Sequence, residues 1–170
     1  MVEIDGLGLF RPTRTGGYEF VAKTTPKVFL AYVEEDREAV LKLFAGLQAH
    51  GMDPWLDRRK LMPGQNWPRS IERAIEVSDF FLACLSHRSV AKPGRFQSEL
   101  RYALDCASRL PLEEVYFIPV RLDRCDVPAR IAREIQYVDL FPDWDRGLNR
   151  VIRVIRQQLR RRRSNRAPGG

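Results

Sequence analysis

Six consecutive apolar residues, Phe80–Leu85, constrain the fold of this 170-residue chain more than any other feature. A short run without polar alternation is typical of a strand that is buried on both faces. Four other segments are further strand candidates, the last of them weak: Lys27–Tyr32, Met52–Asp57, Val115–Leu122 and Tyr137–Leu140. Because segments with helical periodicity separate these runs, we predict an α/β fold with a five-stranded parallel sheet and helices on both faces.

The segment around Glu99 is predicted to be a helix that carries a functional carboxylate. Phe96, Leu100 and Ala103 recur at three- and four-residue spacing and form one apolar stripe. The loop signals Lys92–Gly94 precede the stripe, and Glu99 lies beside it at the edge of the expected core. In parallel sheets, ligands bind beyond the carboxyl ends of the strands. We therefore expect Glu99 at the mouth of a pocket; the alternative is a solvated glutamate on a helix surface.

Composition and charge suggest one domain with two unlike ends. We expect an N-terminal extension over residues 1–25, either a short hairpin or a mobile segment, a domain over 26–159, and a basic flexible tail over 160–170. The net charge of +7 comes largely from arginines near the C-terminus. A solubilising tail or a linker is the favoured interpretation of these arginines. Nucleic-acid contact is the less favoured one, because no aromatic residues are interleaved for stacking.

The cysteines and the absence of apolar targeting signals indicate a cytoplasmic protein. Cys84, Cys106 and Cys125 are odd in number and lack metal-like spacing, which is typical of reduced thiols. The chain has only two histidines, His50 and His87, and so offers few residues for a zinc site or a Cys–His catalytic pair. We therefore expect no metal. We find no signal peptide and no membrane-spanning run, and we expect no membrane partner.

Four segments, in order, resemble the Toll/interleukin-1 receptor (TIR) domain family in its bacterial form. They match the first box, the second strand with the long BB loop, the third strand, and the helix that carries the catalytic glutamate in enzymatic members: Val28–Tyr32, Trp55–Trp67, Phe81–Ser86 and Phe96–Leu104. Two positions depart from the family pattern. Ala31 replaces the usual serine of the first box, and Arg95 stands where many members have tryptophan.

The resemblance implies a three-layer flavodoxin-like fold and cleavage of the nicotinamide–ribose bond of NAD+, with NAD+ as a substrate and no cofactor. Glu99 stands at the family's catalytic position. One carboxylate suits this reaction, because nicotinamide leaves as a neutral molecule and needs no general acid, unlike the leaving group of ordinary glycosidases. An anionic Glu99 could stabilise the positive charge that develops on the ribose. The product, linear or cyclic ADP-ribose, stays open.

Around Glu99 we expect side chains that hold the substrate. Asp57 would bond the ribose, Lys60 would attract the diphosphate, and an aromatic ring would contact the nicotinamide. The complete set of candidates is Tyr32, Asp57, Lys60, Trp67, Ser86 and Phe96. The resemblance also implies self-association through the BB loop, Leu61–Trp67, and a role in bacterial immune (anti-phage) defence or NAD-depletion signalling.

Three other interpretations concern parts of the same sequence. A non-enzymatic TIR adaptor would dock through the BB loop and leave Glu99 idle. A response-regulator receiver needs an aspartate after the third strand, whereas the chain has Cys84–Ser86 there. A site that retains a dinucleotide is disfavoured because Tyr32–Asp36, after the first strand, contains no glycine.

Overall fold

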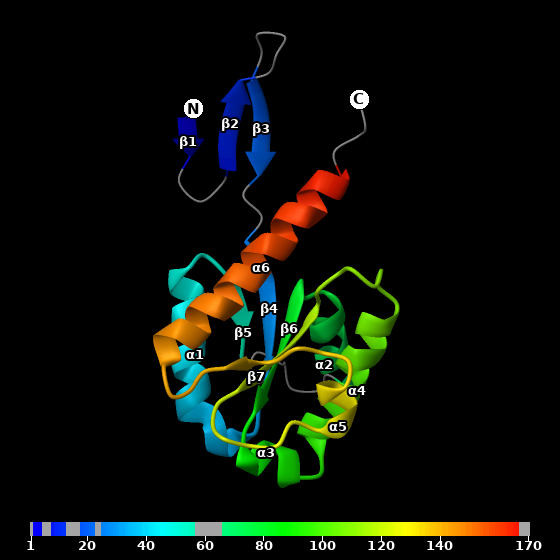
Figure 1. Ribbon diagram of the computed structural model, residues 1–170. Helices are drawn as coiled ribbons and strands as arrows, with labels where there is room; N and C mark the ends of the chain where they lie inside the picture. The colour runs from blue at the N-terminus through cyan, green and yellow to red at the C-terminus, as the bar shows by residue number, and fades with distance from the viewer. Residues whose placement is uncertain (1, 5–7, 13–17, 23–24, 57–65, 167–170) are drawn as a thin grey trace.

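The computed structural model describes residues 2–4, 8–12, 18–22, 25–56 and 66–166, and its main body is a five-stranded parallel sheet (Figure 1). The strand order is β5-β4-β6-β7-β8, and every neighbouring pair is parallel. The strands are β4 Lys27–Ala31, β5 Asp53–Trp55, β6 Phe80–Leu85, β7 Phe117–Arg121 and β8 Val138–Asp139. The predicted sheet is confirmed, and the apolar run that predicted it is the central strand.

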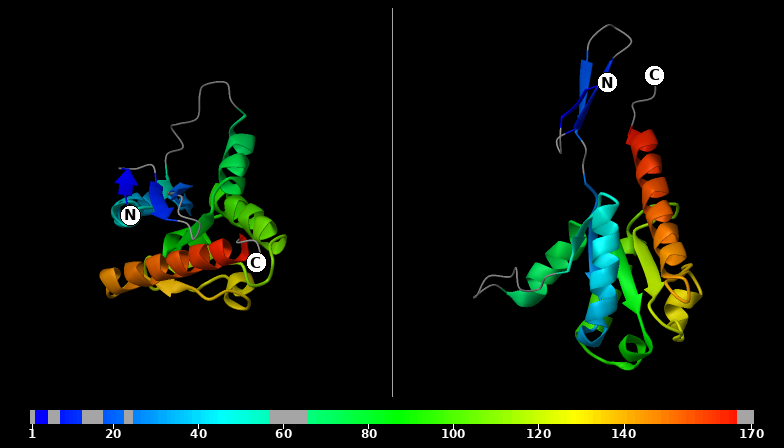
Figure 2. Two further views of the ribbon diagram at one scale, coloured as in Figure 1. Left: turned by 90° about the horizontal axis from the view of Figure 1, so that it is seen from above. Right: turned by 90° about the vertical axis from the view of Figure 1, so that its left-hand side faces the viewer.

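Helices cover both faces of this sheet (Figure 2). The short 3-10 helix Glu34–Asp36 leads into α1. The helices are α1 Arg37–Ala49, α2 Trp67–Glu76, α3 His87–Ala91, α4 Arg95–Ser108, α5 Ala129–Ala132 and α6 Trp144–Arg166. Helices α1 and α6 pack on one face, and α2 and α4 pack on the other, which gives the expected three layers.

Two apolar cores lie on opposite sides of the sheet because successive strand residues point to opposite faces. In β6, Phe80, Leu82 and Cys84 belong to the core beneath α1 and α6. The alternate β6 residues, with Phe81 and Leu85 among them, belong to the core beneath α2 and α4. Both faces of β6 are therefore dry, and this explains why its sequence shows no polar alternation.

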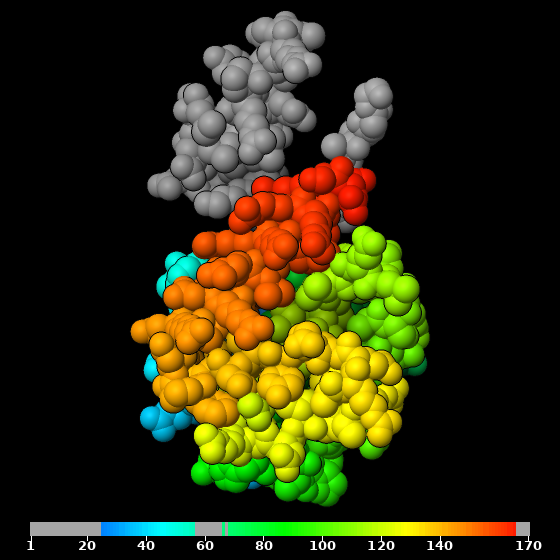
Figure 3. Space-filling view, viewed as in Figure 1, coloured from blue at the N-terminus to red at the C-terminus, as the bar shows by residue number. Residues whose placement is uncertain are grey.

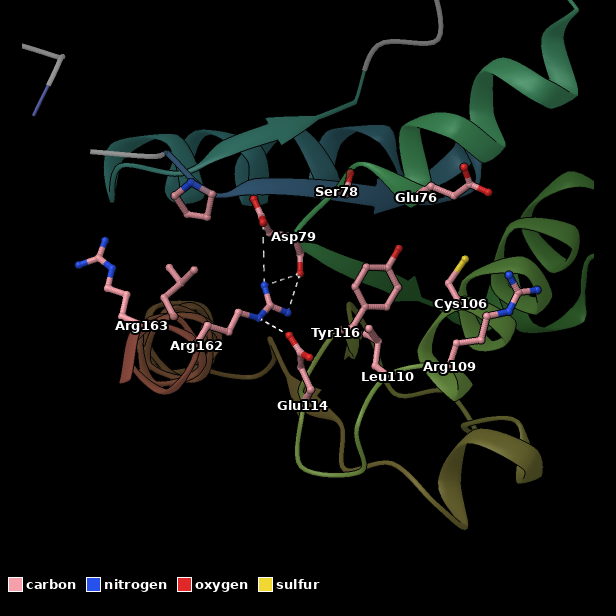
Figure 4. A pocket seen from close by; sticks show the side chains of 12 residues that line it. Glu76, Ser78, Asp79, Cys106, Arg109, Leu110, Glu114, Tyr116, Arg162 and Arg163 are labelled. Carbon is pink, nitrogen blue, oxygen red and sulfur yellow. Dashed lines mark hydrogen bonds and ion pairs between the residues drawn. The ribbon is translucent and has the colours of Figure 1, made fainter. Parts of the chain in front are cut away.

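The C-terminal arginine segment differs from the prediction. Helix α6 continues to Arg166, so residues 160–166, which the sequence assigned to a flexible tail, are helical. In Figure 3 this helix, coloured orange to red, lies on the surface of the molecule. Arg162 explains the added turns, because its guanidinium donates to the backbone carbonyls of Asp79 and Val115 at 3.2 Å. Its Nε also lies 2.6 Å from Glu114 Oε1, as Figure 4 illustrates.

The N-terminal segment contains strands of its own. β1 Val2–Ile4, β2 Gly8–Pro12 and β3 Tyr18–Ala22 pair antiparallel as a separate sheet in the order β1-β2-β3. For this segment the sequence left open a short hairpin or a mobile segment. The structure has the hairpin pairing of two antiparallel strands, with a third strand added. The domain boundaries at residues 25 and 159 stay predictions. Within the described residues, no helix combines the length and apolar content needed to cross a membrane.

Candidate functional site

Helices α2 and α4 border a cavity of about 360 Å³ on one side of the sheet. Each helix contributes four residues at positions i, i+3, i+4 and i+7, which is the spacing of one helix face. The lining residues are Pro68, Ile71, Glu72 and Ile75 from α2, and Arg95, Ser98, Glu99 and Tyr102 from α4. The α2 wall is apolar except for Glu72, whereas the α4 wall carries the polar groups of Arg95, Ser98, Glu99 and Tyr102.

Local sequence signals position the two helices. Pro68 stands in the first turn of α2, where its missing N–H removes no helix bond. Asn66 caps the same helix, because its side chain accepts from the Arg69 backbone N–H at 3.3 Å. Gly94 precedes α4 with a φ of 123°, a conformation that favours glycine. These caps fix where each helix begins and so which side chains meet across the cavity.

Glu99 lines the cavity and is only 3% exposed. The expectation of a carboxylate beside the apolar stripe is confirmed, since Phe96, Leu100 and Ala103 form the neighbouring core. The side chain is more buried than a residue at a pocket mouth would be. A carboxylate removed from water interacts more strongly with a nearby developing charge, because the local dielectric is low. Burial therefore increases what this group could do electrostatically.

Tyr102 is a lining residue that the sequence analysis missed. It lies three positions after Glu99 on the same face of α4, and that spacing was the available signal. Its hydroxyl donates a hydrogen bond to the carboxylate of Glu76. This bond, more than its partial burial, raises the pKa of Tyr102 to about 12. As a lining residue, Tyr102 offers its ring to the cavity.

Three of the predicted site residues lie away from the cavity lining. Tyr32 is buried in the core beneath α1 and α6, on the opposite side of the sheet from Glu99. Its position after the first strand predicted that Tyr32 lies at the carboxyl ends of the strands, but this position could not predict which face of the sheet the side chain takes. Phe96 is 5% exposed and packs in the core beside α4 instead of lining the cavity. An aromatic contact from Phe96 would require repacking of that core.

Ser86, the third of these residues, belongs to a polar cluster at the carboxyl ends of β4 and β6. It is 1% exposed, and its hydroxyl donates to Asp36 Oδ2 at 2.5 Å. The same hydroxyl accepts from the Ser89 backbone N–H at 3.1 Å and caps α3. Arg88 closes the cluster, with Nη1 at 3.7 Å from Asp36 Oδ1. These contacts give Ser86 a structural role in the conformation described.

The remaining candidates fall outside what the structure describes. Asp57, Lys60 and most of the BB loop Leu61–Trp67 lie between the described residues 56 and 66. Trp67 begins α2, but its side chain is not described. Their roles stay predictions.

A second cavity, of about 440 Å³, lies at the amino ends of the strands (Figure 4). Its lining includes Pro26, Asp79 and Tyr116, each of which directly precedes a strand of the sheet. None of the predicted site residues lines it. We therefore take the cavity between α2 and α4 as the candidate site.

Comparison with known proteins identifies relatives over most of the chain. The sequence pattern of the TIR domain family (TIR_2) matches residues 28–152. The TIR domain of the Toll-related receptor TRR-2 from Hydra magnipapillata is similar, with 26% identity and a TM-score of 0.58, over 74% of this chain and 97% of that one. A CMP N-glycosidase, BcmB of Clostridium botulinum, shares the fold at 15% identity and a TM-score of 0.50, over 74% and 97% of the two chains.

One curated protein is related in sequence. The protein y4cD of Sinorhizobium fredii (strain NBRC 101917 / NGR234) is 27% identical over 123 residues, which is 72% of this chain. The match spans 19% of the length of that relative.

Proposed function

Because the chain belongs to the TIR domain family, we propose that it cleaves the nicotinamide–ribose bond of NAD+, with Glu99 as the catalytic residue. The observation that carries this proposal is a buried carboxylate in the wall of a cavity between two helices. Glu99 occupies the position that the family resemblance assigns to catalysis. The bacterial type and the catalytic role of this helix are parts of the same proposal.

The chemistry balances with one carboxylate. The bond between the ribose carbon and the pyridinium nitrogen breaks, and its electron pair leaves with nicotinamide, which becomes neutral. The ribose carbon becomes cationic, and the anionic Glu99 stabilises it by charge. Water then adds to this carbon and releases a proton to solvent, which gives ADP-ribose; attack by a nucleophile within the same molecule would give a cyclic product instead.

The dimensions of the cavity suit the reacting half of the substrate. A volume of about 360 Å³ lies near the lower end of the range for ligand pockets, roughly 300–1,000 Å³. We infer that nicotinamide and its ribose enter the cavity while the rest of NAD+ lies outside. Arg95 is exposed at the start of α4, where its positive charge suits the diphosphate. Tyr102 replaces Phe96 as our candidate for the ring against nicotinamide.

Support for an N-glycosidic reaction also comes from fold likeness, which is weaker. BcmB is a CMP N-glycosidase with the same fold, so this architecture accommodates enzymes that act on N-glycosidic bonds. At 15% identity the likeness concerns the fold alone. The burial of Glu99 is therefore the stronger support.

We extend the proposal to assembly and biological role. We infer that subunits associate through the BB loop Leu61–Trp67 and that association completes the NAD+ site. We also propose that the protein acts in the cytoplasm, where consumption of NAD+ would serve anti-phage defence or NAD-depletion signalling. The alternative function is a non-enzymatic adaptor that acts by TIR–TIR contact.

The test is an NAD+ cleavage assay on the full chain. Purified protein is incubated with NAD+ at low and high protein concentration, and nicotinamide release is followed by chromatography. We expect nicotinamide together with ADP-ribose or its cyclic form. Folded protein that releases no nicotinamide at any concentration would favour the adaptor.

A further inference from the structure

Helix α6 carries almost the whole net charge of the chain. It contains nine arginines, one aspartate and no lysine, so its formal charge is +8. Since the whole chain has a net charge of +7, the remaining residues sum to −1. The positive charge is therefore a property of one surface helix, not of the protein in general.

Four arginines of α6 form a row on the side of the helix that faces away from the core. The apolar side of the helix packs in the core beneath α1 and α6, through Leu148, Val151 and Ile155. Arg146, Arg150, Arg153 and Arg160 are exposed and are separated by four, three and seven residues, which places them on the opposite face. From Arg146 to Arg160 the row extends about 21 Å, at 1.5 Å per residue.

Most of these charges have no partner among the residues that the structure describes. Six exposed arginines of α6 make no side-chain hydrogen bond or ion pair with any other residue that the structure describes: Arg146, Arg150, Arg153, Arg160, Arg161 and Arg163. By contrast, Arg162 is held by Glu114 and by two backbone carbonyls. The fold uses Arg162 for stability, and the exposed row is left for another molecule.

The chemistry of the row favours a phosphate backbone. Arginine presents a planar fork that pairs with phosphate through two hydrogen bonds. The apolar face of α6 is already buried, so the helix cannot insert that face into a lipid surface. The exposed face has no aromatic residue for stacking on unpaired bases, which disfavours single strands. In Figure 3 the helix lies open along its length, without described residues covering it on that face.

We propose that the arginine face of α6 binds double-stranded nucleic acid through its phosphates, without reading sequence. The order of the helix changes the interpretation of these arginines, because a rigid row presents its charges together whereas a flexible tail does not. This binding is independent of the proposed NAD+ cleavage, since the row lies on α6, on the opposite side of the sheet from the Glu99 cavity.

The test uses the full chain and fluorescently labelled 24-base-pair duplexes of DNA and of RNA. Anisotropy is measured from 50 to 300 mM KCl. With five to six phosphate contacts, log K against log [KCl] should have a slope of about −5. The triple variant Arg150→Gln, Arg153→Gln, Arg160→Gln should reduce this slope by about 3, one unit for each lost contact. Comparison of the DNA and RNA duplexes shows which backbone is preferred.

A charge-matched control separates the row from net charge. Arg101, Arg124 and Arg130 are exposed and lie outside α6, and replacing all three by glutamine should leave the slope within one unit of the wild-type value. Thermal melts confirm that both variants fold. The proposal is overturned if no duplex binds at 50 mM KCl, if both triple variants lose the same slope, or if vesicles with 30% phosphatidylserine bind more tightly than either duplex.

Discussion

Replacing Arg162 with alanine should destabilise the protein, although the residue lies within a run of four arginines near the end of the chain. Its guanidinium makes three hydrogen bonds of 3.2 Å to the backbone carbonyls of Asp79 and Val115. Its Nε lies 2.6 Å from Glu114, and its charged group lies 4.8 Å from the centre of the Phe80 ring. The side chain is 19% exposed. These contacts attach the last turns of α6 to the starts of β6 and β7.

The size of the effect follows from these contacts. Hydrogen bonds from a charged donor contribute about 1.5–3 kcal/mol each, and a cation over an aromatic ring contributes about 0.5–1 kcal/mol. The three bonds are long and share acceptors, and the adjacent cavity of about 440 Å³ lets water reach the carbonyls that the variant frees. We therefore expect a loss of about 2–3 kcal/mol rather than the sum. In a domain of this size, that loss lowers the melting temperature by about 5–10 °C.

Urea unfolding followed by far-ultraviolet circular dichroism measures this change, with linear extrapolation to water. Arg161→Ala is the matched control, because Arg161 is exposed and unpaired among the described residues; its effect should stay within about 0.5 kcal/mol. Arg162→Lys keeps the charge but loses the fork and should fall between the two. If Arg162→Ala unfolds at the wild-type urea concentration, the end of α6 is not attached to the sheet, and residues from 160 onward behave as a tail.

Three further predictions concern packing, thiol chemistry and assembly. Gly147→Ala should reduce the free energy of unfolding, measured by urea unfolding, by about 2–3 kcal/mol, and Gly46→Ala should reduce it by about 1 kcal/mol. The new Cβ at position 147 would lie 2.3 Å from the backbone oxygen of Asp139, whereas the clash at Gly46 is with a side chain that can rotate. The thiol of Cys84 is 0% exposed, and this burial raises its pKa. Iodoacetamide at pH 8 should therefore modify the half-buried Cys106 before Cys84, and mass spectrometry would show the order of modification. If subunits share the NAD+ site, specific activity should rise with protein concentration; a flat profile would indicate a site built by one chain.

The fold was predictable because its determinants are local. A strand dry on both faces needs an uninterrupted apolar run, and Phe80–Leu85 has the bounds of β6. The stripe of Phe96, Leu100 and Ala103 likewise predicted α4 and placed Glu99 beside the core. These patterns depend on residues within a few positions of one another, which a sequence displays directly.

The parts that were not predictable depend on distant contacts. The C-terminal arginines look like a solvated tail until Arg162 is seen to bond Asp79, 83 residues earlier. Ser86 looks like a pocket hydroxyl until its bond to Asp36, 50 residues away, is known. Tyr32 follows the first strand, but the face it takes is set by how the sheet packs against α1. The spacing of apolar residues along a short segment carries no information about contacts between residues so far apart in the sequence.

The most direct test of the central claim compares Glu99→Gln with wild type in the nicotinamide-release assay. Glutamine keeps the size of the side chain and removes its charge, so the variant should fold while losing the stabiliser of the cationic ribose. Glu38→Gln, an exposed change on α1, is the control for charge alone. We predict that Glu99→Gln reduces NAD+ turnover on the order of a hundredfold or more, with a melting temperature that confirms folding, while Glu38→Gln retains wild-type turnover. Wild-type turnover in folded Glu99→Gln would contradict the assignment of Glu99 as the catalytic residue.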